Sequence, residues 1–108
     1  MSARPTHIVM MTSVASETDA HKLAGILVTA KAAACVQILP IRSCYFWDGK
    51  VANDAECLLL IKTRAGLYEA AADLIKRNHS YEIPEIISLP IVAGSSPYLN
   101  WINAVTSG

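Results

Sequence analysis

Two extended apolar runs joined by Asp48-Gly49 limit what this chain can become. The runs cover residues 35–47 and about 55–62, and an Asp-Gly pair between two such runs is typical of a tight β-hairpin. Pro40 lies in the first run and has no N–H to donate to a ladder, so we expect a sheet edge or a bulge there. The second run is almost continuously apolar, which is typical of a strand covered on both faces.

The segment before the hairpin predicts a strand followed by a helix. A short apolar run indicates the strand at about 7–13. Ser16, with Asp19 three residues later, comes close to a capping box at the start of the helix, and apolar residues then recur with the helical period. Lys31, near the end of this helix, suits the negative end of the helix dipole.

The segment after the hairpin predicts a second helix, a fourth strand and a third helix. Apolar spacing indicates the second helix within residues 63–78. Pro84 and Pro90 bracket the fourth strand, which must be short or lie at an edge. Ser96 as cap and Pro97 at the first helical position then begin a short amphipathic C-terminal helix.

The order β-α-β-β-α-β with an added helix predicts an α+β fold of the ferredoxin-like, or split βαβ, type. Right-handed crossovers would lay both crossover helices on one face of a four-stranded antiparallel sheet. We expect a single domain over residues 1–108, because a chain of this length has room for only one core. The opposite sheet face would then be bare in a single subunit.

The composition indicates that this bare face is covered by other copies of the chain. Hydrophobic residues make up 53% of the sequence and charged residues only 17%, and the mean hydropathy is +0.34. A small domain cannot hide so much apolar surface alone, and a large exposed apolar patch favours association. We therefore expect an oligomer.

Charge and cysteine content exclude several other classes of protein. Nine basic and nine acidic residues cancel without forming runs, so neither nucleic acid nor an anionic membrane is expected as a main partner. The N-terminal apolar stretch is too short for a signal peptide, which predicts a cytoplasmic protein. Three widely spaced cysteines indicate reduced thiols rather than a disulfide framework, and without a Cys-x-x-Cys pair they do not predict zinc.

Five segments resemble, in order and spacing, the CutA family, also called CutA1 or divalent-cation tolerance proteins. The likeness covers roughly residues 8 to 105. It implies a ferredoxin-like subunit, a homotrimer with the architecture of the PII signalling proteins, and a link to copper or other divalent cations. The segments are "AACVQILPI", "YFWDGKV", "LLLIKT", "HSYEIPEIISLPI" and "YLNWI".

The resemblance also implies where copper would bind. Family members with a copper site have a cysteine at the end of strand 1 and two adjacent histidines before a Pro-Tyr pair. In this chain the corresponding positions are Thr12, the pair Asn78-His79, and Ser80 in place of the proline. Copper and zinc favour thiolate and imidazole ligands. Because one imidazole of that set survives, we expect no high-affinity copper site of this design.

His79 is the first candidate metal ligand, with Glu82 and Glu85 as neighbouring oxygen donors. The alternative is a helix-end histidine that bonds the last carbonyls of its helix. Tyr81 and Glu82 belong to the family segment and are candidates for ligand contact, or for hydrogen bonds at a subunit boundary.

The cysteines have a metal interpretation and a packing interpretation. Cys35 is a candidate ligand at the start of the second strand, although a buried cysteine usually packs as a small hydrophobe. Cys44 and Cys57 stand on either side of the turn. They could face each other across the hairpin as a Cu(I)-binding pair, or simply pack.

The aromatic run at residues 45–47 and Lys62 are candidates for a ligand cleft. Strand alternation sends Tyr45 and Trp47 to one face and Phe46 to the other, where they could stack on a ligand or cover a trimer core. Lys62, at the end of the third strand, could attract an anion between subunits, or be solvated or salt-bridged.

No catalytic motif is present, so we expect a binding or signalling protein rather than an enzyme. The favoured function is a homotrimer linked to divalent-cation tolerance, with weak metal binding around His79. The alternative is a PII-like sensor that binds a small anion in clefts between subunits, and this rests on likeness of fold alone. An acylphosphatase would need a phosphate-cradling loop with an arginine after strand 1, and "TSVASETD" has neither glycine nor arginine.

Overall fold

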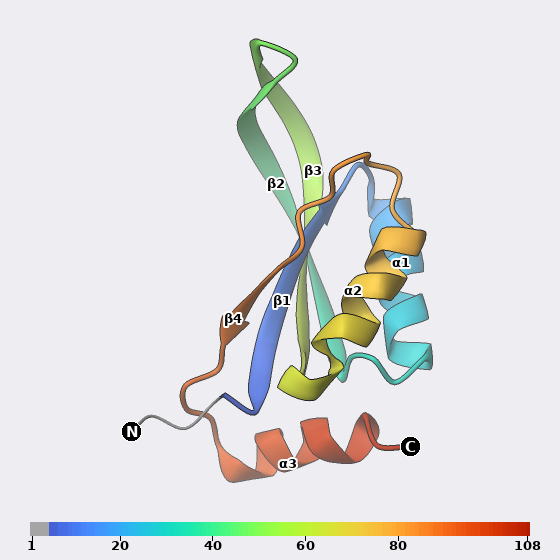
Figure 1. Ribbon diagram of the computed structural model, residues 1–108, viewed down its shortest axis with the longest axis vertical. Coiled ribbons are helices and arrows are strands. Elements are labelled where there is room, and N and C mark those ends of the chain that lie inside the picture. The colour runs from blue at the N-terminus through green and yellow to red at the C-terminus, as the bar shows by residue number, and fades with distance from the viewer. Residues whose placement is uncertain (1–4) are drawn as a thin grey trace.

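The computed structural model describes residues 5–108 and confirms the predicted order of strands and helices (Figure 1). The fourth strand is short, as predicted, although it includes Pro90 as its last residue, and a single 3₁₀ turn precedes the second helix. The elements are β1 (His7–Val14), α1 (Glu17–Thr29), β2 (Cys35–Trp47), β3 (Lys50–Arg64), η1 (Ala65–Leu67), α2 (Tyr68–Arg77), β4 (Ile87–Pro90) and α3 (Ser96–Val105).

The four strands form one antiparallel sheet in the order β2-β3-β1-β4. The helices α1 and α2 contact each other and lie on the same side of the sheet, while α3 lies across one end (Figure 1). This arrangement is the α+β, ferredoxin-like topology that the element order predicts. It leaves β2 and β4 as the two edge strands.

The hairpin forms as Asp48-Gly49 predicts. Trp47 pairs with Lys50, and the two turn residues have φ angles of 52° and 76°. Positive φ at both central residues is the requirement of the turn type that best matches strand twist. β2 has the predicted bounds, whereas β3 is longer than expected because it begins at Lys50, immediately after the turn. The hairpin therefore projects past the helices (Figure 1).

Pro40 lies on the edge strand, which confirms one of its two expected placements. The register shows no bulge there, because Pro40 pairs with Cys57 within an unbroken ladder. An edge strand tolerates proline because its missing N–H can face away from the sheet.

The expectation that β3 is covered on both faces is wrong within one chain. From Cys57 to Thr63, buried residues alternate with half-exposed ones. Met10, Leu59 and Ile61 are fully buried and belong to the core beneath the helices. Their neighbours along each strand point to the other side. We call that side the second face; its large aliphatic residues are Val9, Met11, Leu39, Ile41, Leu58, Leu60, Ile87 and Leu89.

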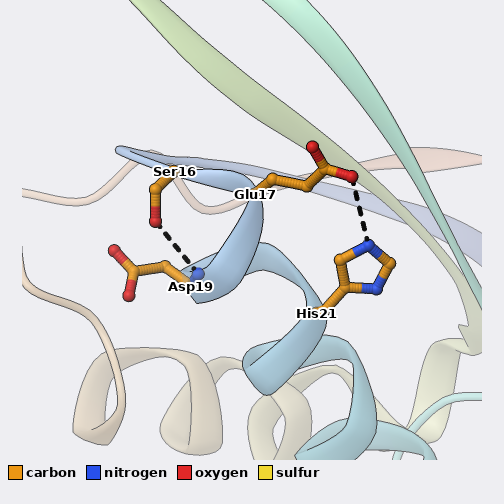
Figure 2. Close-up of polar contacts among 4 residues, drawn as sticks. All are labelled: Ser16, Glu17, Asp19 and His21. Atoms are coloured by element: carbon orange, nitrogen blue, oxygen red, sulfur yellow. Dashed lines mark hydrogen bonds and ion pairs between the residues drawn. The ribbon is translucent and has the colours of Figure 1, made fainter.

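The start of α1 follows the sequence prediction. The Ser16 hydroxyl accepts a hydrogen bond from the Asp19 backbone N–H at 3.1 Å, and Glu17 contacts His21 one turn later at 3.6 Å (Figure 2). A capping oxygen of this kind satisfies a backbone donor that has no partner inside the helix.

The role predicted for Lys31 is wrong. The helix ends at Thr29, and Lys31 lies beyond its last turn with a φ of 59°. The Ala32 N–H bonds the Leu27 carbonyl and the Lys31 N–H bonds that of Val28, which is a Schellman termination of the helix. Lys31 therefore occupies the left-handed position that glycine usually takes.

The third helix is capped one residue earlier than predicted, at Ser95, and that serine makes no side-chain capping bond. Two polar contacts hold α3 against the sheet. His7 Nε2 lies 2.9 Å from Asn103 Oδ1, and Arg64 donates to the Thr106 hydroxyl at 2.8 Å and to its carbonyl at 3.0 Å. These contacts place α3 at the Arg64 end of β3.

Within residues 5–108, no helix combines the length and hydrophobicity that crossing a bilayer requires.

Candidate functional site

A large hollow lies where the loop between α2 and β4 meets the outer half of the hairpin. We call it the acidic groove, and its volume is about 650 Å³. The loop passes close to the end of β1 before it reaches β4 (Figure 1). The groove is lined by Ser13, Ser43, Cys44, Tyr45, Trp47, Glu56, Ser80, Tyr81, Glu82, Ile83 and Glu85.

A buried carboxylate forms the floor of this groove. Glu56 lies on β3 and is only 8% exposed, and its Oε2 accepts a hydrogen bond from the Tyr81 hydroxyl at 2.6 Å. Burial, and after it the bond to Glu56, raises the pKa of Tyr81. The phenol therefore stays protonated and donates to the carboxylate across the whole physiological range.

A second tyrosine–carboxylate pair lies nearer the tip of the hairpin. The Tyr45 hydroxyl donates to Asp54 on the neighbouring strand. This hydrogen bond, and then desolvation, raises the pKa of Tyr45. The pair is exposed, so it orients the Tyr45 ring without burying a charge.

The groove brings together five of the predicted candidates: Cys44, Tyr45, Trp47, Tyr81 and Glu82. Glu85 joins them, and Glu56 is a member that the sequence analysis missed. The signal for Glu56 was present, since it is the one charged residue directly before the apolar run "CLLLI". A charge at that point of a strand marks the place where an apolar face becomes polar.

His79 has both ring nitrogens occupied. Nε2 lies 2.8 Å from the Ser13 carbonyl, and Nδ1 accepts the Tyr81 N–H at 3.1 Å. Because a carbonyl only accepts, these bonds assign the proton to Nε2 and the lone pair to the Tyr81 amide. The ring also packs against Tyr81, with centroids 4.8 Å apart. The loop is thus tied to the end of β1, and the helix-end alternative for His79 does not describe its contacts.

His79 lines a smaller hollow, separate from the groove except for Ser80. Asp19 and Lys22 of α1 line it too. Asp19 is therefore the carboxylate that shares a hollow with His79, whereas Glu82 lines the acidic groove. This proximity could not be identified from the sequence, because residues 19 and 79 are far apart in the chain.

Thr12, which the resemblance places where a copper-binding cysteine would lie, is in the core. It is fully buried, and its hydroxyl has no hydrogen-bond partner among residues 5–108. A buried hydroxyl without a partner carries a desolvation cost of roughly 1–3 kcal/mol.

Cys35 and Lys62 lie far from His79. They face each other across β2 and β3, and Lys62 also pairs with Val9, four residues along β1 from Ser13. Lys62 donates a hydrogen bond to Gln37. The structure therefore does not bring Cys35 together with His79 and Glu82, and Lys62 is not part of the acidic groove.

The expectation that Cys44 and Cys57 could face each other is wrong. Cys44 pairs with Asn53, and Cys57 pairs with Pro40. The three cysteines are free: Cys44 is exposed, Cys35 is half-buried and Cys57 is buried.

The donor set of the family's copper site does not fit these residues. One ligand position is a core threonine, and the remaining imidazole already has two hydrogen bonds. Among residues 5–108, no three His, Cys, Asp or Glu side chains lie close enough together to hold a metal ion. A soft thiolate and imidazole set of the copper type is therefore not built into a single chain.

Replacing Thr12 by valine should raise the free energy of unfolding by about 1 kcal/mol, because the change removes an unpartnered buried hydroxyl at nearly constant volume. Urea denaturation measures the effect. Thr63→Val is the matched control, since Thr63 is equally buried but donates to the Ala32 carbonyl at 2.7 Å. That variant should lose about 1 kcal/mol, and equal shifts in the two variants would contradict the assignment.

Replacing Tyr81 by phenylalanine should destabilise the chain by about 1–3 kcal/mol, because the Glu56 carboxylate loses its donor. Tyr45→Phe removes an exposed pair and should change stability by less than about 0.5 kcal/mol. The measurement is urea denaturation at neutral pH, and equal losses would contradict the importance of burial.

The same variant tests the pH dependence. The folded-state pKa of Tyr81 is raised above its ordinary value of about 10. The protonated phenol therefore stabilises the fold fully below pH about 10, and this contribution is lost as the pH rises further. The free energy of unfolding of the wild type should fall above that pH, and that of the Tyr81→Phe variant should fall less steeply.

Comparison with known proteins finds the same fold and the same sequence pattern. The family model described as CutA1 divalent ion tolerance protein matches residues 8–105. The chloroplastic protein CutA 1 of rice is 46% identical over 100 residues, which are 92% of this chain and 56% of that protein. The divalent-cation tolerance protein CutA of Pectobacterium atrosepticum is 37% identical over 96% of this chain and 97% of its own length.

Solved structures agree with the sequence matches. The crystal structure of CutA1 from the psychrotrophic bacterium Shewanella sp. SIB1 superposes with a TM-score of 0.94 at 36% identity, covering 98% of this chain and all of that one. The chain spans about half the length of the plant relatives it matches and nearly all of the Pectobacterium protein. The chain belongs to the CutA1 family of divalent ion tolerance proteins.

Proposed function

We propose that this protein serves in divalent-cation tolerance as a non-catalytic binding protein. The observation that carries the proposal is the match of residues 8–105 to the CutA1 divalent ion tolerance model. The Thermus thermophilus relative, 40% identical over 91% of this chain, is also named a divalent-cation tolerance protein. The site contributes carboxylates and hydrogen-bonded tyrosines, and none of its side chains is paired as a nucleophile with a base.

Metal binding by this chain is proposed to be weak and to involve the loop after α2. His79 becomes a ligand only when its bond to the Ser13 carbonyl opens, because Nε2 carries the proton in the closed arrangement. Glu82 supplies an exposed carboxylate three residues later, and Asp19 supplies one beside His79. Cys35 could bind only a separate ion at the other end of the sheet.

Association into a trimer is proposed from the second face and the sheet edges. Leu39, Ile87 and Leu89 on that face are 42%, 46% and 50% exposed. The edge strands β2 and β4 lie at opposite sides of the sheet and expose unpaired backbone groups. In head-to-tail association, β2 of one copy pairs with β4 of the next. Such pairing closes into a ring when the rotation between neighbouring copies divides a full turn evenly. Three copies would bury the apolar residues at the centre.

The anion-sensor alternative finds no support in the groove. Carboxylates line the groove. The candidate anion-binding residue, Lys62, lies elsewhere on the sheet, where it donates a hydrogen bond to Gln37. A small anion would therefore meet repulsion in the acidic groove.

We propose a cytoplasmic location, because an odd number of widely spaced cysteines suits a reducing compartment. Related proteins carry other locations in their names: the rice and Arabidopsis proteins are called chloroplastic, and the Archaeoglobus fulgidus protein is called periplasmic.

Titration calorimetry with Cu(II) and Zn(II) tests the metal proposal. The wild type should bind with a dissociation constant in the range of about 0.1–1 mM, because few donors are free and one hydrogen bond must open first. His79→Ala should weaken binding several-fold, and His21→Ala, an exposed histidine on α1, is the matched control. Equal affinity of the His79→Ala variant and the wild type would remove His79 from the proposal.

Leu39→Glu tests the covering of the second face. In an isolated chain this half-exposed position should tolerate a charge with a change below about 0.5 kcal/mol. If copies bury the face, the variant should lower the thermal midpoint by about 5 °C or more, since burying an unpaired charge costs several kcal/mol. Val92→Glu is the control, because Val92 is 91% exposed and outside that face. Equal midpoints for the two variants would contradict association through this surface.

A further inference from the structure

The acidic groove occupies the polar end of an otherwise apolar sheet face. Ser13, Tyr45 and Trp47 point to the same side of the sheet as Leu39 and Leu58. Tyr45 and Trp47 follow Leu39 on β2 by an even number of residues, and Ser13 pairs directly with Leu58. The loop after α2 folds over this end and places Tyr81 on Glu56. The groove is therefore distinct from the apolar residues proposed to join copies.

The charge of the groove has a single sign. Glu56, Glu82 and Glu85 line it, and none of the described residues that line it is a lysine, arginine or histidine. Concave surfaces of one charge concentrate the field and attract ligands of the opposite charge. The groove therefore selects a cation.

Glu56 strengthens this selection because its largely buried carboxylate has no cationic partner among the described residues. It is 92% buried, given its 8% exposure, and its hydrogen bond comes from the neutral Tyr81 hydroxyl. Within residues 5–108, the ion pairs are His21–Glu17 and Arg77–Asp73, neither of which involves Glu56. A buried carboxylate without a cation is costly, so a cationic group beside it would gain more than at the surface.

A single metal ion does not match the spacing of these carboxylates. No three acidic, histidine or cysteine side chains of the described residues converge closely enough to hold one. The groove has the volume of a small-molecule site, which typically lies between about 300 and 1,000 Å³. A ligand with its charges spread along a chain can reach carboxylates that a compact ion cannot join.

Aromatic rings supply the rest of the recognition. Tyr45 and Trp47 on β2 and Tyr81 on the loop line the same groove, and their hydroxyl bonds orient two of the three rings. The faces of such rings attract ammonium groups and also cover methylene chains. An aliphatic amine needs carboxylates to pair with its ammonium groups and aromatic rings to cover its methylene carbons, and the groove provides both.

We propose that the acidic groove binds an organic polycation of the diamine or polyamine class. One ammonium group lies beside Glu56, a second lies between Glu82 and Glu85, and the methylene chain crosses Trp47 and Tyr45. This site requires neither a bound metal nor His79, so it stands or falls separately from the divalent-cation proposal.

Fluorescence of Trp47 provides a direct test with the intact chain. The sequence has two tryptophans, and Trp101→Phe leaves Trp47 in the groove as the only one. Spermidine should change the emission of Trp47 with saturation, at near-physiological salt, and should raise the thermal midpoint of the wild type. Octanediol, a neutral chain of similar length, should do neither. Absence of a response to millimolar spermidine would overturn the proposal.

Two double variants with equal net charge separate specific binding from general attraction. Glu82→Gln with Glu85→Gln removes two groove carboxylates and should weaken spermidine binding about tenfold, as expected for two ammonium–carboxylate contacts. Glu17→Gln with Glu69→Gln removes two exposed carboxylates on α1 and α2, outside the groove, and should leave binding unchanged. Equal weakening in the two double variants would overturn the proposal.

The native mass of the groove variant distinguishes a ligand site from an interface. Mass by light scattering should be the same for the wild type and the Glu82→Gln, Glu85→Gln variant. A lower mass for the variant would mean that a basic side chain of another copy fills the groove, and that result would also overturn polyamine binding. Failure of Cu(II) and Zn(II) to bind would leave this inference unaffected.

Discussion

The pairing of β2 with β3 is the interaction on which the rest of the structure depends. The ladder runs without interruption from Cys35–Lys62 at one end to Trp47–Lys50 at the turn. Its inner half provides β3 as the neighbour of β1 and as the surface on which both crossover helices pack. Its outer half extends beyond those helices and gives the chain a longest dimension of 44 Å. Most residues in this outer half of the hairpin are exposed in a single chain.

The second face changes character along this ladder. Near Leu39 and Leu58 it is apolar, which suits contact with other copies. At Glu56 it becomes acidic, and the loop after α2 closes over it through Tyr81. The bond between His79 and the Ser13 carbonyl holds that loop against β1. One continuous surface therefore supports two proposed activities, self-association and ligand binding, at positions separated by a few residues along the same strands.

The fold could be predicted from local signals because those signals agree with the global arrangement. The Asp48-Gly49 turn, the cap at Ser16 and the edge position of Pro40 each follow from the chemistry of one or two residues. The errors occur where distant contacts decide. Lys31 accepts a left-handed backbone because the helix must stop there, and the alternation along β3 depends on which face the helices cover.

The site was predictable only in part for the same reason. Trp47, Tyr81 and Glu82 were identified from the sequence, and they do lie together. Sequence reasoning could not place Cys35 and His79 apart, because their separation depends on the sheet register. It also missed that His79 bonds Ser13 and that Asp19 lies beside it, since residues more than fifty positions apart in sequence become neighbours only when the sheet and helices pack.

Sedimentation equilibrium of the wild-type chain at micromolar concentration is the most direct test of whether copies cover the second face. Association as proposed gives a single species with three times the 11.6 kDa mass of one chain. A folded, monodisperse species of 11.6 kDa would contradict it, because the exposed apolar residues of β2 and β4 would then remain in water.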